Sequence, residues 1–406
     1  MRTQFSPSDR LLVAMSGGVD SSAVAWMLRE AGHDLVGLFM RNGVDVKESE
    51  AAKKSCCSLG DARDARMVAA GLGIPFQAID LKAEFADVID YFVSEYGRGR
   101  TPNPCAVCNR DLKMGKLLAF ADELGCAGVA TGHYARISVE DGRVRLRRGV
   151  DRSKDQSYQL FPVAEEHLAR TATPLGDLEK PVVRDMAREA GLKTFAKKDS
   201  QEICFVPSND YRKLLAERGV ELHPGRIVDV FGRDHGEHTG TENFTIGQRR
   251  GLGVALGTPM YVVEIHPDEG LVVLGSENDC KAPSMRVADL NWVGFDVPSS
   301  RTFRCGVQVR YRHSAAPATV EVDADGAAAT VTFDEPQMAV APGQGAAFYE
   351  LDESGGPGDL PPGDLPPGDL LLGDLLLGGG WIESAVRPTE TPGAADGAAR
   401  STAAGH

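Results

Sequence analysis

LLVAMSGGVDSSAVAWMLREAG, residues 11–32, runs from a short apolar strand through a glycine-containing turn into a helix that ends at Gly32. The same alternation continues, with apolar strands expected at 35–40, 75–80 and 127–132 and helical spacing between them. Strands interleaved with helices of ~10 to 15 residues predict a parallel sheet covered by helices on both faces. Ligands of such sheets bind beyond the carboxyl ends of the strands.

The second half of the chain has a different texture, with short alternating runs separated by Gly, Pro and Asp that are typical of antiparallel hairpins. We therefore expect an α/β fold: a doubly wound parallel-sheet nucleotide-binding domain (1–208), a small central β-rich domain (209–282) and a C-terminal β-barrel-like domain (283–386). The Gly-Asp-Leu repeat at about 355–377 is proline-rich and of low complexity, which predicts a flexible insertion. Residues 387–406 are expected to form a disordered tail.

Bulk composition favours a soluble protein of the cytoplasm. No apolar run approaches the ~18 to 20 residues that span a bilayer, and the first 15 residues do not resemble a signal peptide. We expect no membrane partner. The chain has 8 cysteines, and in a reducing compartment a cysteine pair is more often chemical than a structural disulfide.

The formal net charge of −14 does not exclude a nucleic-acid partner, because its distribution is uneven. Residues 351–406 hold 9 acids and 2 arginines, a local charge of −7. Basic runs lie elsewhere, at GRVRLRR (142–148), GQRRG (247–251) and RYRH (310–313). Charge alone therefore leaves an RNA partner open and does not establish one.

The turn AMSGGVDSS, residues 14–22, carries the clearest chemical signal. Backbone N–H groups at the start of the following helix suit a phosphate, and Gly17 and Gly18 allow close approach. Asp20 could cap the helix or hold Mg²⁺ on the phosphates. No Lys-Ser/Thr follows the glycines, so this is not the loop of ATPases that cleave at the γ-phosphate. It resembles the pyrophosphatase-type loop of adenylating enzymes.

A second signal is TPNPCAVCN, residues 101–109, whose two thiols could clamp a metal, cycle as a redox pair or present one nucleophile. A zinc-binding module is one interpretation, but no second Cys-x-x-Cys or His-x₃-His completes such a site. The stretch alone does not decide between the remaining roles of Cys105 and Cys108.

Eight stretches occur in the order found in tRNA-specific 2-thiouridylases, and the chain resembles that family over about residues 10–350 and again at GGGWIE (378–383). They are SGGVDSS, GLFMRN, TPNPCAVCN, ATGHYAR, KDQSYQL, KDSQEICF, TIGQRRGLG and APGQGAAFY. The resemblance implies ATP-dependent adenylation of the 2-oxygen of the wobble uridine (position 34) of tRNA and its replacement by sulfur. It also implies a sulfur-donor protein as a partner, a cysteine desulfurase or a relay.

The resemblance places a persulfide on Cys204 and the partner nucleophile on Cys108. In one common form of the motif an aspartate occupies the position of Cys105. Two routes therefore remain open. Either Cys108 acts while Cys105 stands by, or all three thiols hold an iron–sulfur cluster with one iron open to sulfide. Another adenylating ligase of the same loop class, using an amine or ammonia, is the rival enzyme and would not need two cysteines.

The remaining expected contacts follow from the loop and from the resemblance. ATP with Mg²⁺ is expected against Ala14, Met15, Ser16, Gly17, Gly18, Val19, Asp20, Ser21, Met40 and Gly132. The tRNA is expected against His133, Lys154, Asp155, Gln156, Arg310, Tyr311 and Gln344. No residue is expected to be a ligand of a resident metal ion outside the cluster alternative.

Overall fold

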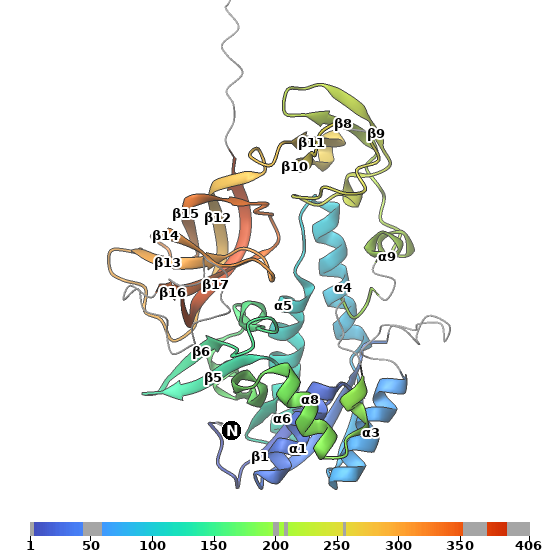
Figure 1. The fold of residues 1–406 in the computed structure, drawn as a ribbon, viewed down its shortest axis with the longest axis vertical. Helices are drawn as coiled ribbons and strands as arrows, with labels where there is room; N and C mark the ends of the chain where they lie inside the picture. Colours follow the sequence, from blue (N-terminus) through green and yellow to red (C-terminus); the bar gives the residue numbers. More distant parts are fainter. Residues whose placement is uncertain are drawn as a thin grey trace, which may run out of the picture.

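The computed structural model describes residues 4–43, 59–197, 203–206, 210–254, 257–351 and 372–387. Figure 1 shows a parallel-sheet domain, a small β domain and a β-barrel domain. The long helix α4 (Lys82–Gly97) runs from the first of these toward the second. The expected fold class is confirmed. Within the described residues no helix is long and apolar enough to cross a membrane.

The N-terminal sheet has five parallel strands in the order β3-β2-β1-β4-β7. They are β1 (Arg10–Ala14), β2 (Asp34–Arg41), β3 (Phe76–Asp80), β4 (Gly128–Ala130) and β7 (Thr171–Ala172). Leu11, Leu12 and Val13 of β1 are fully buried, as expected for a strand covered on both faces. The strand order reverses at β1, so the loop after β1 lies at the switch point where such sheets bind ligands.

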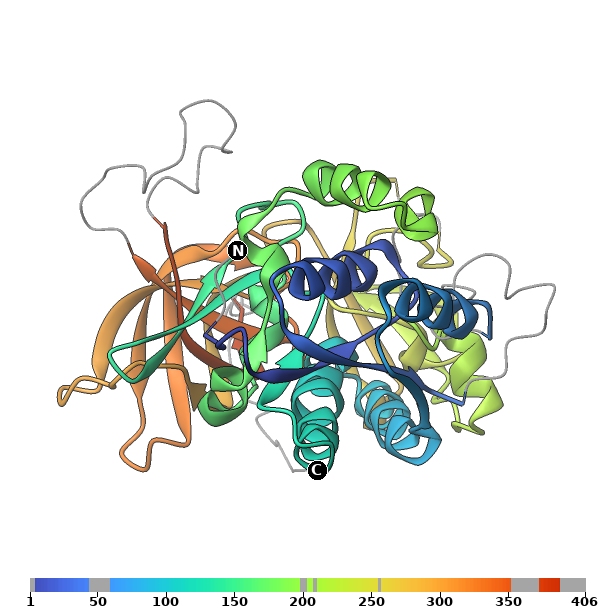
Figure 2. The ribbon, with the colours of Figure 1, turned by 90° about the horizontal axis from the view of Figure 1, so that it is seen from below.

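Helices cover both faces of this sheet, as Figure 2 shows from below. Side chains of α1 (Val19–Glu30), α3 (Leu59–Leu72) and α8 (Lys180–Glu189) form the hydrophobic cluster on one face. The cluster on the other face contains residues of α4 (Lys82–Gly97), α5 (Pro104–Cys108), the π-helix η1 (Asn109–Lys116), α6 (Leu117–Glu123) and α9 (Tyr211–Glu217). Shorter elements are η2 (Ser157–Leu160), α7 (Glu165–Ala169), η3 (Pro174–Asp177) and η4 (Lys193–Ala196).

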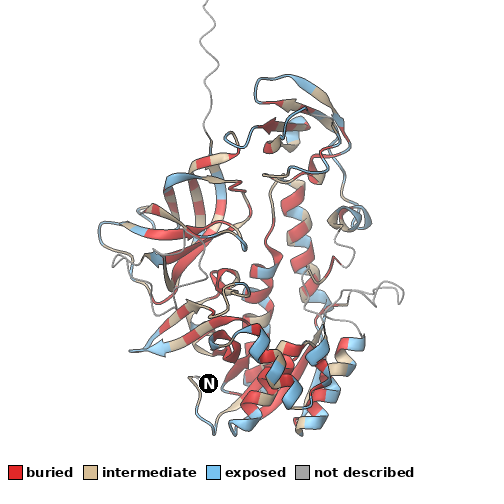
Figure 3. Cartoon of the chain, viewed as in Figure 1, coloured by how far each residue is buried: buried red, intermediate tan, exposed pale blue. Residues whose placement is uncertain are grey.

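The middle domain is a four-stranded sheet in the order β10-β11-β8-β9, with its own small core. Its strands are β8 (Gly225–Asp229), β9 (Asp234–His238), β10 (Tyr261–His266) and β11 (Leu271–Gly275), with the short helices η5 (Thr241–Asn243) and η6 (Pro267–Glu269). Figure 3 shows long exposed stretches on this domain, in contrast to the buried residues gathered along the parallel sheet and α4.

The C-terminal domain is a closed barrel, because β12 pairs with both β15 and β17. Its strands are β12 (Lys281–Trp292), β13 (Thr302–Gln308), β14 (Ala316–Val322), β15 (Ala328–Met338), β16 (Gly345–Leu351) and β17 (Leu372–Val386). The hairpin of β5 (Ala135–Glu140) and β6 (Arg143–Arg148) extends this sheet through β17. A hairpin inserted between strands of the first sheet is therefore part of the sheet of the last domain.

We predicted that residues 355–377 form a flexible insertion throughout, and this is wrong for the last part of the repeat. Its last unit belongs to β17, where Leu376 is fully buried and pairs with Leu146 of β6. Asp374 forms ion pairs with Arg136, at 2.5 Å, and with Arg152. The unit is ordered because its leucines enter the two hydrophobic clusters on either side of β17. Residues 355–371 and the tail beyond Arg387 lie outside the described residues.

Candidate active site

The loop between β1 and α1 has the form that an anion site requires. Gly18 is the N-cap of α1, and no described side chain caps this end, so the amides of the first turn lack a side-chain acceptor. The loop is stiffened from within, because the Ser21 hydroxyl accepts from the Ser16 amide at 3.0 Å. The Ser22 hydroxyl donates to the Gly18 carbonyl at 2.8 Å.

Two glycines allow close packing around this loop. Gly17 has a φ of +73°, and a Cβ there would meet the carbonyl oxygen of Asp61 at 2.2 Å. A Cβ on Gly132 would lie 3.2 Å from the Ser21 amide nitrogen. Gly132, expected near the nucleotide, therefore borders the loop. Met40 lies near the carboxyl end of β2, beside β1, and is partly buried against the second cluster.

Asp20 does not cap α1. Both of its oxygens accept from Lys180 Nζ at 2.7 Å, and Oδ1 also accepts from the Tyr134 hydroxyl at 2.8 Å. Lys180 is 6% exposed and begins α8. Asp20 is therefore paired with a buried lysine in this structure, and whether it also holds Mg²⁺ stays a prediction.

A second lysine binds the loop from a distant part of the chain. Lys197 Nζ donates to the Gly17 carbonyl at 3.0 Å and to Asp64 at 2.8 Å, and it also pairs with Asp61. Sequence reasoning missed both Lys180 and Lys197. The available signal was indirect: a phosphate loop without its own lysine needs cations from elsewhere.

The cysteine segment begins α5 and is fixed at its start. Asn103 is the N-cap, and its Oδ1 accepts from the Ala106 amide at 3.3 Å, with Pro104 in the first turn. Cys105 is exposed, whereas Cys108 is 7% exposed and belongs to the hydrophobic cluster under α4. The two thiols of the Cys-x-x-Cys therefore face different surroundings.

Cys204 reaches the same cluster as Cys108 from the segment 203–206. Its neighbour Phe205 is buried and packs edge-on against Phe92 of α4, with 5.3 Å between ring centroids. Cys204 is half-buried against the cluster that contains Cys108, and Cys105 is not part of it. Within the described residues, which include all three thiols, no group of three or more His, Cys, Asp or Glu could hold a metal ion. Cys108 and Cys204 thus border the same hydrophobic cluster, and whether they react as a pair or hold a cluster together with Cys105 stays a prediction.

Residues 131–133, at the carboxyl end of β4, connect the loop to the cysteine helix. Gly132 borders the loop, while His133 Nε2 lies 3.1 Å from Oδ1 of Asn109, the residue after Cys108. His133 Nδ1 lies 2.7 Å from the Thr131 hydroxyl. Burial lowers the pKa of His133 well below its ordinary value, and the charge of Lys113 adds to the shift. His133 is a neutral, buried link in this conformation.

The barrel domain holds the chain just before the cysteines. Gln344 Nε2 donates to the carbonyls of Thr101, at 3.1 Å, and Pro102, at 2.8 Å. The Thr101 amide donates to the Pro342 carbonyl at 2.8 Å. Gly343 has a φ of +89°, and a Cβ there would meet the Thr101 carbonyl oxygen at 2.8 Å. Gln344, expected at the tRNA, thus holds the loop before the cysteine helix through two hydrogen bonds in this structure.

The neighbouring barrel loop contains the other expected RNA contacts. The Arg310 side chain is half-buried and donates to the Ile246 carbonyl of the middle domain at 2.7 Å. Tyr311 is 37% exposed. Burial raises the pKa of Tyr311, and the neighbouring Asp155 and Cys105 add to the shift. Tyr311 is therefore the more exposed residue of this pair, and its ring lies near that of Tyr158, with 6.4 Å between centroids.

The segment Lys154–Gln156 is largely committed to the protein itself. The Asp155 carboxylate accepts from the Gly149 amide at 2.9 Å and from the Ser157 amide at 3.0 Å. Gln156 Oε1 accepts from the Tyr134 amide at 3.0 Å. Asp155 and Gln156 therefore shape the turn under the site in this structure.

Comparison with known proteins agrees with this architecture. Family models match as a tRNA methyl transferase HUP domain (residues 9–208), a tRNA methyl transferase PRC-barrel domain (212–276) and an aminomethyltransferase beta-barrel domain (282–358). A tRNA-specific 2-thiouridylase of Carboxydothermus hydrogenoformans is 47% identical over 359 residues, which is 86% of this chain and 97% of the relative. One of Solibacter usitatus is 45% identical over 361 residues, 85% and 97% of the two chains. The chain belongs to the tRNA-specific 2-thiouridylase family. Because the chain belongs to the 2-thiouridylase family, we expect the nucleotide loop and the cysteine segment to serve the same reaction.

Proposed function

We propose that the protein is a tRNA-uridine 2-sulfurtransferase. It uses ATP to adenylate the 2-oxygen of the wobble uridine (position 34) of tRNA and replaces that oxygen by sulfur from a persulfide on Cys204, releasing AMP and pyrophosphate. A sulfur-donor protein loads the persulfide. Mg²⁺ enters on the phosphates of ATP as part of the substrate, and Asp20 remains a candidate contact for it.

One observation supports this proposal most directly: adjacent residues reach both reactive centres. Gly132 borders the nucleotide loop and His133 binds Asn109 beside Cys108. The activated oxygen and the sulfur chemistry then belong to one edge of the sheet. That is the edge at which doubly wound folds bind their ligands.

In the first step the uridine 2-oxygen attacks the α-phosphorus of ATP and pyrophosphate leaves. The loop amides and the N-terminus of α1 stabilise the departing charge. The RNA must present an unstacked base for this attack. The exposed Cys105 marks the side of the cysteine helix from which such a base would enter.

In the second step the terminal sulfur of the Cys204 persulfide bonds to carbon 2 of the uracil. The Cys108 thiolate attacks Cys204 Sγ, and the electrons of the broken S–S bond remain on the sulfur attached to the base. AMP departs as the carbon–sulfur double bond forms, and a Cys108–Cys204 disulfide remains for reduction by a small or protein thiol. The shared cluster of Cys108 and Cys204 supports this pairing.

The experiment is tRNA thiolation by iron-free protein purified without oxygen, given ATP and a sulfur donor, with tRNA nucleosides analysed by mass. We expect activity in the wild type, loss of turnover in Cys108→Ala and Cys204→Ala, and a smaller loss in Cys105→Ala. The cluster route predicts equal loss at all three positions and activity proportional to bound iron. An amine-using ligase predicts full activity in the Cys108→Ser/Cys204→Ser variant.

A further inference from the structure

We propose that Arg249, Arg250 and Arg312 form a phosphate-binding strip for the RNA backbone that leads to the cysteine helix. The inference rests on the proposed function, because it names the surface by which the same substrate is held. The strip spans two loops, 246–254 of the middle domain and 310–313 of the barrel.

The two loops are joined by direct contacts. The Arg310 guanidinium holds the Ile246 carbonyl at 2.7 Å. A Cβ on Gly247 would meet Cβ of Ala339 at 2.4 Å, so the loop 246–254 packs directly against the barrel. Gln248 fixes the turn, because its Oε1 accepts from the Thr245 amide at 3.1 Å and its Nε2 donates to the Arg250 carbonyl at 3.1 Å. Arg249 and Arg250 therefore lie on a loop whose turn is held by the hydrogen bonds of Gln248.

These arginines differ from the other basic run of the chain. In GRVRLRR every arginine is used internally: Arg143 pairs with Asp296, Arg147 with Glu140 and Arg148 with Asp155. Arg145 donates to the Gly294 carbonyl at 2.9 Å.

Arg249, Arg250 and Arg312 are exposed, and in the described part of the chain no carboxylate forms an ion pair with any of them. In a protein of net charge −14, three guanidiniums without acidic partners on adjoining loops are a local positive surface.

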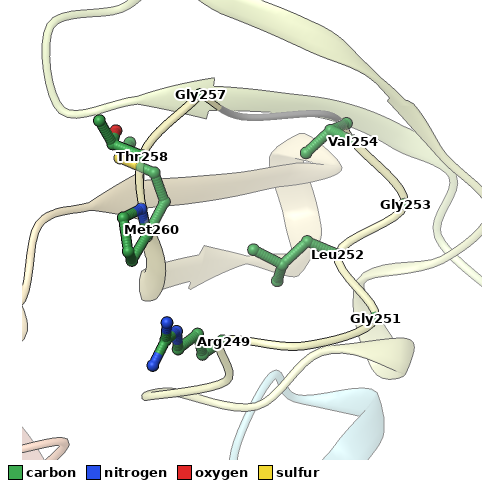
Figure 4. A pocket seen from close by; sticks show the side chains of 9 residues that line it. Arg249, Gly251, Leu252, Gly253, Val254, Gly257, Thr258 and Met260 are labelled. Carbon is green, nitrogen blue, oxygen red and sulfur yellow. The ribbon is translucent and has the colours of Figure 1, made fainter.

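The strip begins at the proposed entry for the base. Tyr311 precedes Arg312, and its ring centroid lies 6.4 Å from that of Tyr158. Tyr158 shares a hydrophobic cluster with Ala106 of the cysteine helix α5. At the other end, Arg249 stands at the rim of a hollow of about 650 Å³ beside Leu252 and Met260 (Figure 4). Arginine can lay its apolar stem along such a rim and keep the guanidinium in water.

Phosphate is the ligand chemistry that this arrangement fits best. Guanidinium groups bind phosphate oxygens through paired N–H donors, and a nucleic-acid backbone presents phosphates at regular intervals along an extended path. Such contacts give affinity and orientation without reading sequence. The strip would hold the strand beside the flipped base while the pocket recognises the base itself.

The test compares Arg249→Gln/Arg250→Gln and Arg312→Gln with the wild type and with Arg29→Gln/Arg63→Gln. The control arginines lie on α1 and α3, are also exposed, and have no ion pair among the described residues. The tRNA dissociation constant is measured from about 50 to 200 mM salt, and thiolation is measured at saturating tRNA.

We expect the double variant to weaken tRNA binding about tenfold at low salt and to reduce the slope of log K against log salt by about 0.9 per arginine removed. Turnover at saturating tRNA and the control variant should stay within about twofold of the wild type. Unchanged affinity and slope would overturn the strip, as would impaired sulfur loading with normal tRNA binding, which would indicate an acidic protein partner. If the wild type binds tRNA through the strip but does not thiolate it, the proposed reaction fails and the surface stands.

Discussion

At the scale of single residues, Lys197 is the contact whose removal should report most directly on the nucleotide loop. It binds the Gly17 carbonyl and two aspartates of α3. Charged hydrogen bonds of this kind contribute about 1.5 to 3 kcal/mol. We expect Lys197→Met to lower kcat/KM for ATP by about 10- to 100-fold, measured as pyrophosphate release.

Lys193→Met is the matched control, because Lys193 is an exposed lysine on the same segment. The tRNA affinity should not change in either variant, since the loop does not hold the RNA backbone. A parallel loss of tRNA binding in Lys197→Met would instead mean that the lysine supports the fold of the whole segment.

Gln344 should control how well Cys108 is shielded. Its side chain donates two hydrogen bonds to the loop before α5, and Gln344→Ala removes both. We expect alkylation of Cys108 to accelerate about tenfold, corresponding to about 1.4 kcal/mol of local opening, as measured by mass spectrometry of the labelled peptide. Gln337→Ala is the control, since the Gln337 side chain donates to the nearby Glu335 carbonyl and not to the loop before α5 among the described residues. Equal labelling in both variants would show that these hydrogen bonds do not shield the thiol.

The residues of the site were predictable only where chemistry is written locally in the chain. The glycines of the loop and the Cys-x-x-Cys could be read from short stretches, because turns and thiol pairs are local features. Lys180 contacts Asp20 across 160 positions, and no spacing rule relates them. Whether Gln344 and Arg310 bind tRNA stays a prediction, but their internal bonds depend on domain packing that the sequence does not state.

At the scale of elements, β17 shows where composition misleads. The repeat GDLPPGDLPPGDLLLGDLLLGGG has the same Gly-Asp-Leu composition along its length, and its prolines and aspartates predict a flexible insertion throughout. Its last unit nevertheless completes the barrel, because position next to β16 and β12 decides which leucines find a hydrophobic cluster. Periodic strands in the first domain were predictable, whereas the pairing of β6 with β17 was not.

Two deletions test this division of the repeat. Removing residues 355–371 should leave the melting temperature and thiolation nearly unchanged. Removing 355–377 deletes the buried Leu376 and the Asp374 that pairs with Arg136 and Arg152. Loss of one buried leucine costs about 2 to 5 kcal/mol. At about 2 to 4 °C per kcal/mol, the longer deletion should lower the melting temperature by about 4 to 20 °C, and loss of the ion pairs adds to this. Equal stability of the two proteins would contradict the role of the strand.

At the scale of the whole molecule, the order of the three folds along the sequence was predictable and their interlocking was not. Hydrophobic periods distinguish a parallel sheet from hairpins because each reflects its own burial. They do not show that the β5–β6 hairpin joins the barrel sheet, or that the barrel holds the cysteine loop. Those contacts join residues more than 200 positions apart, and they depend on how the folded domains pack against one another.

This interlocking predicts that the first domain does not fold well alone. Ile137, Leu146 and Tyr158 share a hydrophobic cluster with Tyr349 and Leu376 of the barrel. A fragment of residues 1–208 would expose that cluster, and it also loses the stacking of Tyr211 on Tyr96, whose ring centroids lie 4.3 Å apart. We expect it to bind a hydrophobic dye and to lack a cooperative thermal transition.

The fragment 212–276 is the internal comparison, because among the described residues its hydrophobic cluster takes a single buried member, Ala341, from outside that range. A domain of that size is marginal but can fold, so we expect a cooperative transition at a modest temperature. We therefore expect the smaller fragment to unfold cooperatively and the larger fragment not to. A well-folded 1–208 fragment that binds ATP would show that the hairpin packs on the barrel without depending on it, and that the site is assembled from separable parts.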